Sequence, residues 1–230
     1  MHLYRMDVRH QLPQAVRDLA ERLCGSVQSG DVRLTQRGRM RQDSASGWMS
    51  FKAKQTISKV ACAFDWRAQT GPAGVVSVRD ALVGGLGLFD VRALGFFPLA
   101  HTASPALTRG ELMRYLAELA LAPAAVLGNT SLRWRSEGPD RLIVSAGAGE
   151  KAAAVSVTLG SDGRIASIFA PDRQRGVGAK SRRAPWSGQF SDYRLRRGCW
   201  LPFHAEVSWT VDSTKFVYWV GDMQSWAAGV

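Results

Sequence analysis

The sequence predicts a mainly β protein of the α+β type, in which one large curved antiparallel sheet forms a half-barrel with a helix on its inner face. Three observations carry this prediction. About eleven short segments have the alternating or β-branched content of strands, only two segments show strong helical periodicity, and Ser-Gly or Thr-Gly-Pro turns separate many of the strands. A closed barrel is the nearest alternative architecture.

Length and composition are those of an ordinary globular chain. With 230 residues, 46% apolar and 21% charged, the chain can bury a sizeable core, and residues 1–230 are assigned to a single domain. The first ten residues are too polar for the apolar region of a signal peptide, and no run approaches the roughly 18 apolar residues of a membrane span. We therefore expect a cytoplasmic protein without a membrane span.

The first half of the chain begins with a helix and continues as a meander. A helix is expected from Leu12 to Leu23, where Pro13 suits a helix start and apolar residues recur on one face. The strand-like segments that follow are Asp31 to Arg41, Gly47 to Gln55, Lys59 to Gln69 and Val75 to Asp80. Three glycines, Gly84, Gly85 and Gly87, then interrupt an apolar strand, which indicates a bend or a close approach of another backbone.

The central helix is predicted from Thr108 to Leu119 and ends near Pro123. Thr108 and Glu111 have the spacing of a capping box, which places the helix start at Thr108. Leu112, Tyr115, Leu116 and Leu119 recur at helical spacing and predict a buried stripe. Arg114 and Glu118, one turn apart, are expected to pair.

The second half of the chain is predicted to be a second series of strands. These are Leu132 to Ser136, Arg141 to Ser145, Ala152 to Leu159, Arg164 to Phe169, Phe190 to Arg196, Phe203 to Val211 and Lys215 to Gln224. Ser161-Asp162-Gly163 predicts a hairpin turn. Residues 171–184 are polar and rich in Arg and Gly, and we expect a long loop there that acts as a mobile lid.

The net charge of +11 is concentrated in two segments. Residues 164–197 hold nine Arg or Lys against two Asp, and residues 33–67 hold eight against two. Aromatic residues lie among the arginines, as in grooves that stack bases, but no helix-turn-helix, zinc-finger or RNP-type signature is present. A solvated basic face or a site for an anionic small molecule is therefore favoured over a nucleic-acid partner.

Several kinds of chemistry lack support in the sequence. Cys24, Cys62 and Cys199 are far apart and form no CxxC pair, so we expect reduced thiols rather than a disulfide framework or a zinc site. The four histidines have no metal-ligand spacing, and no phosphate loop, dinucleotide fingerprint or Gly-x-Ser-x-Gly elbow occurs. No metal and no cofactor is predicted.

Candidate site residues come from strands and from the central helix. His204 and Glu206 share one face of a predicted strand and could form an acid/base pair, although alternation of polar residues also fits simple solvent exposure. Tyr115, Tyr193 and Tyr218 suit either a core position or a proton donor in a pocket. Six of the eight tryptophans fall in the second half, where their rings could line an apolar cavity or fill it themselves.

An ordered series of motifs spans nearly the whole chain. It includes Gln-Arg-Gly-Arg-Met-Arg at 36–41, Arg-Gly-Glu-Leu-x-Arg-Tyr-Leu-Ala-Glu at 109–118, Phe-x-Asp-Tyr-Arg at 190–194 and Glu-x-x-Trp at 206–209. In these motifs the chain resembles a bacterial family that is catalogued as a domain of unknown function. The family helix continues through a Trp-x-Pro, whereas this chain has Leu121-Ala-Pro123.

At the level of fold, the predicted half-barrel is similar to bacterial lipoprotein carriers and to a violacein-pathway protein that rearranges an indolic intermediate without a cofactor. The resemblance leaves two hypotheses. The first is a cofactor-independent cyclase or isomerase of a biosynthetic pathway, acting on a hydrophobic small molecule. The second is a non-catalytic carrier for an apolar or anionic small ligand.

Both hypotheses use the same candidate residues. The candidate acid/base groups are Glu111, Tyr115, Glu118, Tyr193, His204 and Glu206. The candidate ligand-binding residues are Arg114, Trp134, Arg173, Trp186, Trp209, Tyr218 and Trp219.

Overall fold

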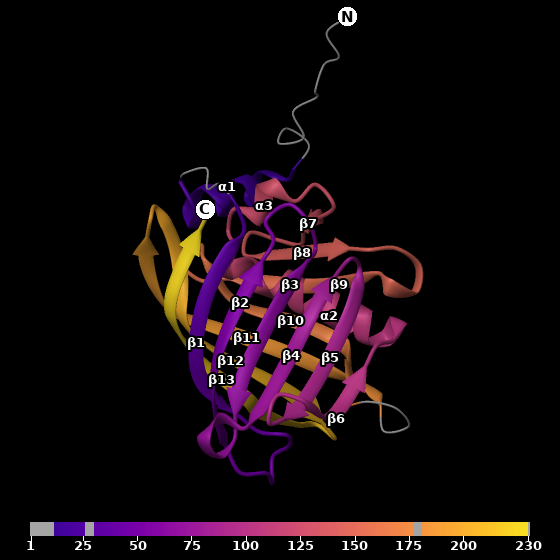
Figure 1. Cartoon of the computed structure of the whole chain (residues 1–230). Helices are drawn as coiled ribbons and strands as arrows, with labels where there is room; N and C mark the ends of the chain where they lie inside the picture. The colour runs from indigo at the N-terminus through magenta and orange to yellow at the C-terminus, as the bar shows by residue number, and fades with distance from the viewer. Residues whose placement is uncertain (1–11, 26–29, 177–180, 230) are drawn as a thin grey trace, which may run out of the picture.

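The structure of the chain, a computed structural model, describes residues 12–25, 30–176 and 181–229. Within these residues a 13-stranded antiparallel sheet curls around a central helix, and Figure 1 shows its two walls crossing in front of and behind that helix. The predicted half-barrel is confirmed, with 13 strands in place of about eleven. The assignment of residues 1–230 to one domain stays a prediction.

The helices are α1 (Gln14–Leu23), α2 (Pro105–Ala117) and α3 (Ala125–Gly128), with 3₁₀ turns at Pro72–Gly74, Glu118–Ala120 and Gly149–Lys151. The first wall consists of β1 (Val32–Met40), β2 (Met49–Ile57), β3 (Phe64–Thr70), β4 (Val76–Val83), β5 (Leu86–Ala93) and β6 (Phe97–Thr102). The second wall consists of β7 (Arg133–Ser136), β8 (Arg141–Ala146), β9 (Ala153–Leu159), β10 (Ile165–Arg175), β11 (Arg182–Arg196), β12 (Cys199–Val211) and β13 (Thr214–Ala228).

The two walls are joined where the last strand pairs with the first. The strand order runs β6-β5-β4-β3-β2-β1-β13-β12-β11-β10-β9-β8-β7, so β1 and β13 are the only non-consecutive neighbours in the described part of the chain. Strands β6 and β7 are the two edges, and α2 lies in the chain between them. This order brings sequence-distant strands together, and one residue from each basic segment, Arg41 and Arg175, lies over the same ring of Phe216.

The first helix forms where the sequence predicts it. Pro13 occupies the N-cap position of α1, and Val16, Leu19 and Leu23 are buried on the predicted apolar face. Pro is compatible with this position because the first helical turn has no partner for its own N–H groups.

The second helix begins three residues earlier than the capping-box pattern indicates. Ser104 is the N-cap: its side chain accepts a hydrogen bond from the Leu107 N–H, and Pro105 is the first helical residue. The predicted start at Thr108 is therefore wrong. The Thr108 hydroxyl instead accepts a hydrogen bond of 2.9 Å from the Gly87 N–H, which ties the helix to β5.

Strand boundaries also differ from the prediction. The apolar segment interrupted by glycines forms the end of β4, a turn at residues 84–85 and β5. The expected loop at 171–184 is largely hairpin, since β10 continues to Arg175 and β11 begins at Arg182. Residues 177–180 of that predicted lid lie outside the described residues. The predicted turn at residues 161–163 is confirmed: the Gly160 N–H donates to the Arg164 carbonyl, and Gly163 has φ +72°.

Gly87 marks the close approach that the glycine cluster indicates. A Cβ at this position would lie 2.7 Å from the Thr108 Cα, which is main chain and cannot move aside without shifting α2. We expect Gly87→Ala to lower the free energy of unfolding by about 1–3 kcal/mol because the helix is forced off the sheet. Urea unfolding of this variant beside Gly47→Ala measures the effect, since nothing lies within 4 Å of a Cβ at Gly47. Equal stabilities of the two variants would contradict this explanation.

One cysteine prediction is corrected by the structure. Cys24, just after α1, and Cys199, at the start of β12, are paired by an isolated antiparallel β-bridge and are joined by a disulfide. Cys62 is not in a disulfide. The sequence gives no sign of this pair because the two cysteines are 175 residues apart and only sheet closure brings them together.

Candidate functional site

A network of buried charged groups lies between α2 and the two walls of the sheet. Arg114 on α2 forms ion pairs of 2.6 Å with Asp80 on β4 and 2.8 Å with Glu118, which confirms the predicted pair with Glu118. Its guanidinium also lies over the rings of Phe64 and Trp66, 4.8 and 5.2 Å from their centroids. The helix is thereby attached to the first wall through charge and ring contacts.

The same helix reaches the second wall through Glu111. Its carboxylate pairs with Arg173 of β10 at 3.1 Å, and both side chains are almost completely buried. Arg173 also donates to the Gly110 carbonyl, and its guanidinium stacks on Trp186 and Trp209, 4.6 and 5.7 Å from the ring centroids. Arg173, Trp186 and Trp209 thus form one packed group rather than the lining of an open cavity.

Charge balance within this network depends on one proton. Two guanidinium groups, from Arg114 and Arg173, face three carboxyl groups, from Asp80, Glu111 and Glu118. Burial, followed by repulsion from Asp80, raises the pKa of Glu111 well above its ordinary value. Glu111 Oε2 and Asp80 Oδ1 are both buried without another partner, so a protonated Glu111 donating to Asp80 makes the network neutral.

The two candidate tyrosines are held by main-chain carbonyl groups. The Tyr115 hydroxyl donates to the Ser58 carbonyl at 3.0 Å and accepts from the Asn129 amide at 2.9 Å. The Tyr193 hydroxyl donates to the Ile165 carbonyl at 2.7 Å. Burial raises the pKa of both tyrosines, which keeps their hydroxyls protonated as donors.

His204 and Glu206 lie apart from the network beneath α2. His204 Nδ1 is 2.7 Å from Asp222 on β13, and His204 Nε2 is 3.6 Å from Glu206. The hydrogen bond to Asp222 raises the pKa of His204. This partly exposed group is reached from solvent, whereas Glu111 is not.

The remaining aromatic candidates mostly pack against one another. Trp209 stacks on Tyr218, whose hydroxyl accepts from the Trp186 indole N–H at 3.2 Å, and Trp219 stacks on Phe51. Trp134 is on the edge strand β7, and its indole nitrogen is buried with no partner in the described part of the chain. In this region the rings fill the interior rather than enclose a hollow.

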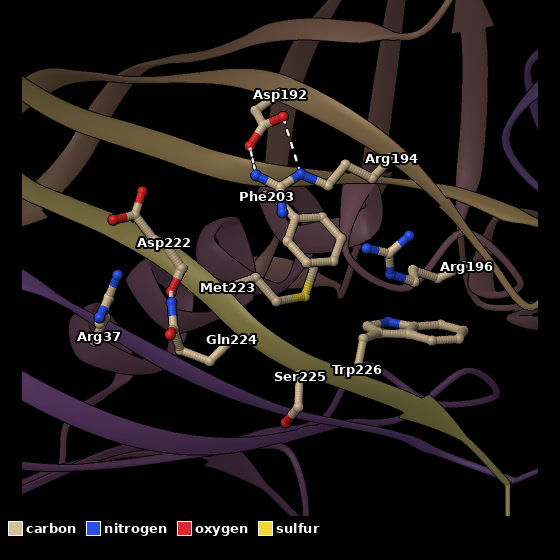
Figure 2. Close-up of a pocket in the computed structure, with 10 residues that line it drawn as sticks. All are labelled: Arg37, Asp192, Arg194, Arg196, Phe203, Asp222, Met223, Gln224, Ser225 and Trp226. Carbon is tan, nitrogen blue, oxygen red and sulfur yellow. Dashed lines mark hydrogen bonds and ion pairs between the residues drawn. The ribbon is translucent and has the colours of Figure 1, made fainter.

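A cleft of about 650 Å³ opens where β11, β12, β13 and β1 meet. Figure 2 shows Phe203, Met223 and Trp226 grouped together, with arginine side chains around them. The complete lining is Arg37, Asp192, Arg194, Arg196, Phe203, Asp222, Met223, Gln224, Ser225 and Trp226. Phe203, Met223 and Trp226 are nearly buried, so a small apolar floor adjoins a mostly polar, charged rim.

The charged edge of this cleft carries more basic than acidic side chains. Asp192 pairs with Arg194 (Nε to Oδ1 3.0 Å), and Asp222 is engaged by His204. Among the described residues, Arg37 and Arg196 have no carboxylate partner; Arg196 donates to the Leu195 carbonyl and lies over Phe203 at 5.0 Å. Through Asp222, the predicted residue His204 borders this cleft.

Local irregularities of the strands create the cleft. Asp192 has φ +53° and is left out of the pairing of β11 with β12, although the register is the same on both sides of it. The register of β1 against β13 shifts between Thr35 and Gln36. A bulge of this second kind bends a strand and redirects its side chains. Sequence reasoning missed this site because bulges leave no simple pattern; the one available signal was the excess of arginine in residues 164–197.

The fold and this cleft together define the class of protein as a half-barrel with an amphipathic surface cleft. Comparison with known proteins shows the family to which the chain belongs. A family described as "Family of unknown function (DUF6544)" matches residues 2–221, and the chain belongs to this family. The resemblance indicated by the sequence motifs is therefore confirmed. No curated protein matches the chain.

Solved structures with the same fold have little sequence in common with this chain. A putative outer membrane lipoprotein-sorting protein domain from Vibrio parahaemolyticus is 11% identical with a TM-score of 0.53, covering 94% of this chain and 91% of that one. A LolA superfamily protein from Nitrosomonas europaea is 9% identical with a TM-score of 0.50, covering 94% and 92%. A DUF1329 family protein from Desulfovibrio piger is 14% identical with a TM-score of 0.52, covering 94% and 93%. At these identities the likeness shows the fold alone.

Proposed function

We propose that this protein binds a hydrophobic small molecule with an anionic head group, without catalysing a reaction. The observation that carries the proposal is the cleft at β11–β13 and β1, where Arg37 and Arg196 stand beside an apolar floor. Guanidinium groups recognise carboxylate and phosphate in bidentate geometry, and the apolar floor suits a hydrocarbon or ring system.

The fold comparisons support the hydrophobic part of this proposed ligand. One similar structure is described as an outer membrane lipoprotein-sorting protein domain and another as a LolA superfamily protein. The net charge of +11 favours an anionic ligand over a cationic one. No helix among the described residues is long and apolar enough to cross a membrane.

A fluorescent fatty acid tests the proposal directly. We expect cis-parinaric acid to bind the purified protein and its methyl ester, which has the same chain without the charge, to bind more weakly. The double variant Arg37→Gln/Arg196→Gln should bind the acid roughly tenfold less tightly or worse, because charged hydrogen bonds to the head group are lost. Fluorescence titration measures the dissociation constants of the acid and the ester for the wild type and for the double variant.

The control for this titration is Arg135→Gln. Arg135 is exposed on β7 and is not among the residues of the cleft, so its loss should leave the affinity for the acid unchanged. Equal binding of acid and ester, or equal affinity of the cleft variant and the wild type, would count against the anionic site.

The enzyme hypothesis takes second place. One observation favours it, the carboxyl of Glu111 with a raised pKa beside Asp80, which is the kind of group that general acids use. The six candidate acid/base groups, however, do not line one cavity: Glu111 and Tyr115 are buried, and His204 and Glu206 are partly exposed elsewhere. Turnover that is abolished by Tyr115→Phe or Glu206→Gln at unchanged melting temperature would restore this hypothesis.

The cellular location also remains open to test. The cytoplasmic location expected from the sequence stays a proposal, and the Cys24–Cys199 disulfide favours an oxidising compartment instead. Alkylation of free thiols in intact cells, followed by mass spectrometry of the two cysteine peptides, distinguishes the two locations.

A further inference from the structure

One end of the half-barrel carries exposed apolar side chains that belong neither to the cleft at β11–β13 and β1 nor to the buried charged network. We call this surface the apolar rim; it consists of Trp48, Met49, Val75, Leu94, Phe96 and Phe97. Phe96, Leu94 and Phe97 are the most open of them, at 64, 58 and 55% exposure. Exposed apolar side chains that gather at one place mark an interaction surface.

Strand pairing places these residues at the same end of neighbouring strands. Val76 pairs with Ala93, and Ala93 in turn pairs with Phe97. The Leu94 N–H donates to the Val75 carbonyl at 2.7 Å, which joins the β5–β6 turn directly to the turn before β4. In Figure 1 the end of β1 and the start of β6 lie toward the lower end of the molecule, away from α1 and the C-terminus.

The two basic segments of the sequence meet at this end. Arg41, beyond β1, and Arg175, at the end of β10, both lie over the ring of Phe216, at 5.9 and 5.5 Å from its centroid. Arg39 and Arg41 also flank Trp48 of the rim, at 4.9 and 4.7 Å. Among the described residues, the charged groups at these strand ends include Arg39, Arg41, Arg175, Arg182 and Lys215, against Asp43 and Asp212; Arg92 and Arg183 are paired with Asp90 and Asp172.

We propose that the apolar rim docks the protein on the surface of an anionic lipid bilayer. The rim is made of separate strand ends and hairpin turns, and the clefts at β11–β13 and at β1–β3 include none of its residues. Projecting apolar tips beside arginines suit the bilayer interface, where apolar groups enter the acyl boundary and cations remain among anionic head groups. Trp48, with two guanidinium groups close to its ring, fits this interface because it combines an apolar ring with a polar N–H.

Vesicle sedimentation tests this docking with the full chain. We expect binding to vesicles of 70% phosphatidylcholine and 30% phosphatidylglycerol, weaker binding to phosphatidylcholine alone, and a decline in binding as salt rises. Phe96→Ser/Phe97→Ser should bind the anionic vesicles at least about tenfold more weakly, because two inserted aromatic rings are lost.

A matched control lies at the other end of the same strands. Val83 and Leu86 are exposed to a similar degree, 52 and 61%, at the β4–β5 turn. Val83→Ser/Leu86→Ser removes comparable apolar area and should leave vesicle binding unchanged, with circular dichroism melting used to verify that both double variants fold. Absence of binding by the wild type, or equal loss in the two variants, would overturn the proposal.

A second copy of the chain is the competing occupant, because β6 is an edge strand with unpaired backbone groups. Light scattering coupled to size exclusion decides this point. A dimer that dissociates in Phe96→Ser/Phe97→Ser, together with vesicle binding that is absent, would assign the rim to self-association and overturn membrane docking.

Discussion

Replacing Arg114 by methionine is expected to lower the free energy of unfolding by about 3–5 kcal/mol, a large part of the roughly 5–15 kcal/mol by which native domains are stable. Arg114 is the shared partner of Asp80 and Glu118, and all three side chains are about 85% buried. Without the guanidinium, the two carboxylates remain in a poorly solvated site without the cation they share, and Asp80 faces Glu111 as well. Methionine keeps much of the side-chain volume, so the loss reports charge rather than a cavity.

The comparison that isolates this effect is Arg135→Met. Arg135 forms an ion pair of 2.6 Å with Glu137, but its side chain is 71% exposed. Exposed pairs contribute about 0–1 kcal/mol because water solvates the separated charges well. Chemical denaturation of both variants measures the difference, and similar losses would show that the buried network contributes no more than a surface pair.

The pH dependence of stability is expected to change when Glu111 is replaced by glutamine. The pKa of Glu111 is raised in the folded protein, so the folded state binds a proton that the unfolded state has already released. This contribution is fully present below the unfolded pKa and is lost as pH rises through the folded pKa. Within that window the wild type should lose about 1.4 kcal/mol of stability per pH unit.

Glutamine mimics the protonated carboxyl, because its amide can donate to Asp80 and it carries no charge. Glu111→Gln should therefore lack this slope and should become more stable than the wild type toward alkaline pH. Urea unfolding between pH 4 and 9 measures both curves. A wild-type curve parallel to that of the variant would show that Glu111 is ionised in the fold.

A second group contributes to the pH dependence with the same sign, and it can be separated. His204 also has a raised pKa, because of its hydrogen bond to Asp222, so its contribution is lost as pH rises through its folded pKa. Both the wild type and Glu111→Gln retain His204. The difference between their curves therefore measures the contribution of Glu111 alone to the pH dependence of stability. The variant His204→Gln measures the contribution of His204.

Much of the secondary structure was predictable because short-range physical chemistry decides it. The apolar faces of α1 and α2 were read from their 3.6-residue period, and all the residues of the predicted stripe on α2 are buried. The turn at residues 161–163 followed from Asp-Gly chemistry. Helix starts were less predictable: Thr108 has the pattern of a cap, but Ser104 with Pro105 starts the helix one turn earlier.

The candidate site was predicted only in part. The pair between Arg114 and Glu118 follows from helical spacing, and it is present. The partners of Glu111 and Arg114 on the sheet, Arg173 and Asp80, lie 62 and 34 residues away and could not be paired from sequence. The roles proposed for the candidate acid/base and ligand-binding residues stay predictions until the variants are measured.

The sequence by itself determined the mainly β class, the helix that lies within the curved sheet, the basic character of the chain and its membership of a family. These properties depend on composition, periodicity and motif order, which are local or additive along the chain. Only the tertiary structure decided the closure of β1 against β13, the Cys24–Cys199 pair, the cleft beside Arg196 and the meeting of both basic segments at the apolar rim. The physical reason is that each depends on strand register and bulges between segments far apart in sequence, where a shift of one residue turns every side chain to the opposite face.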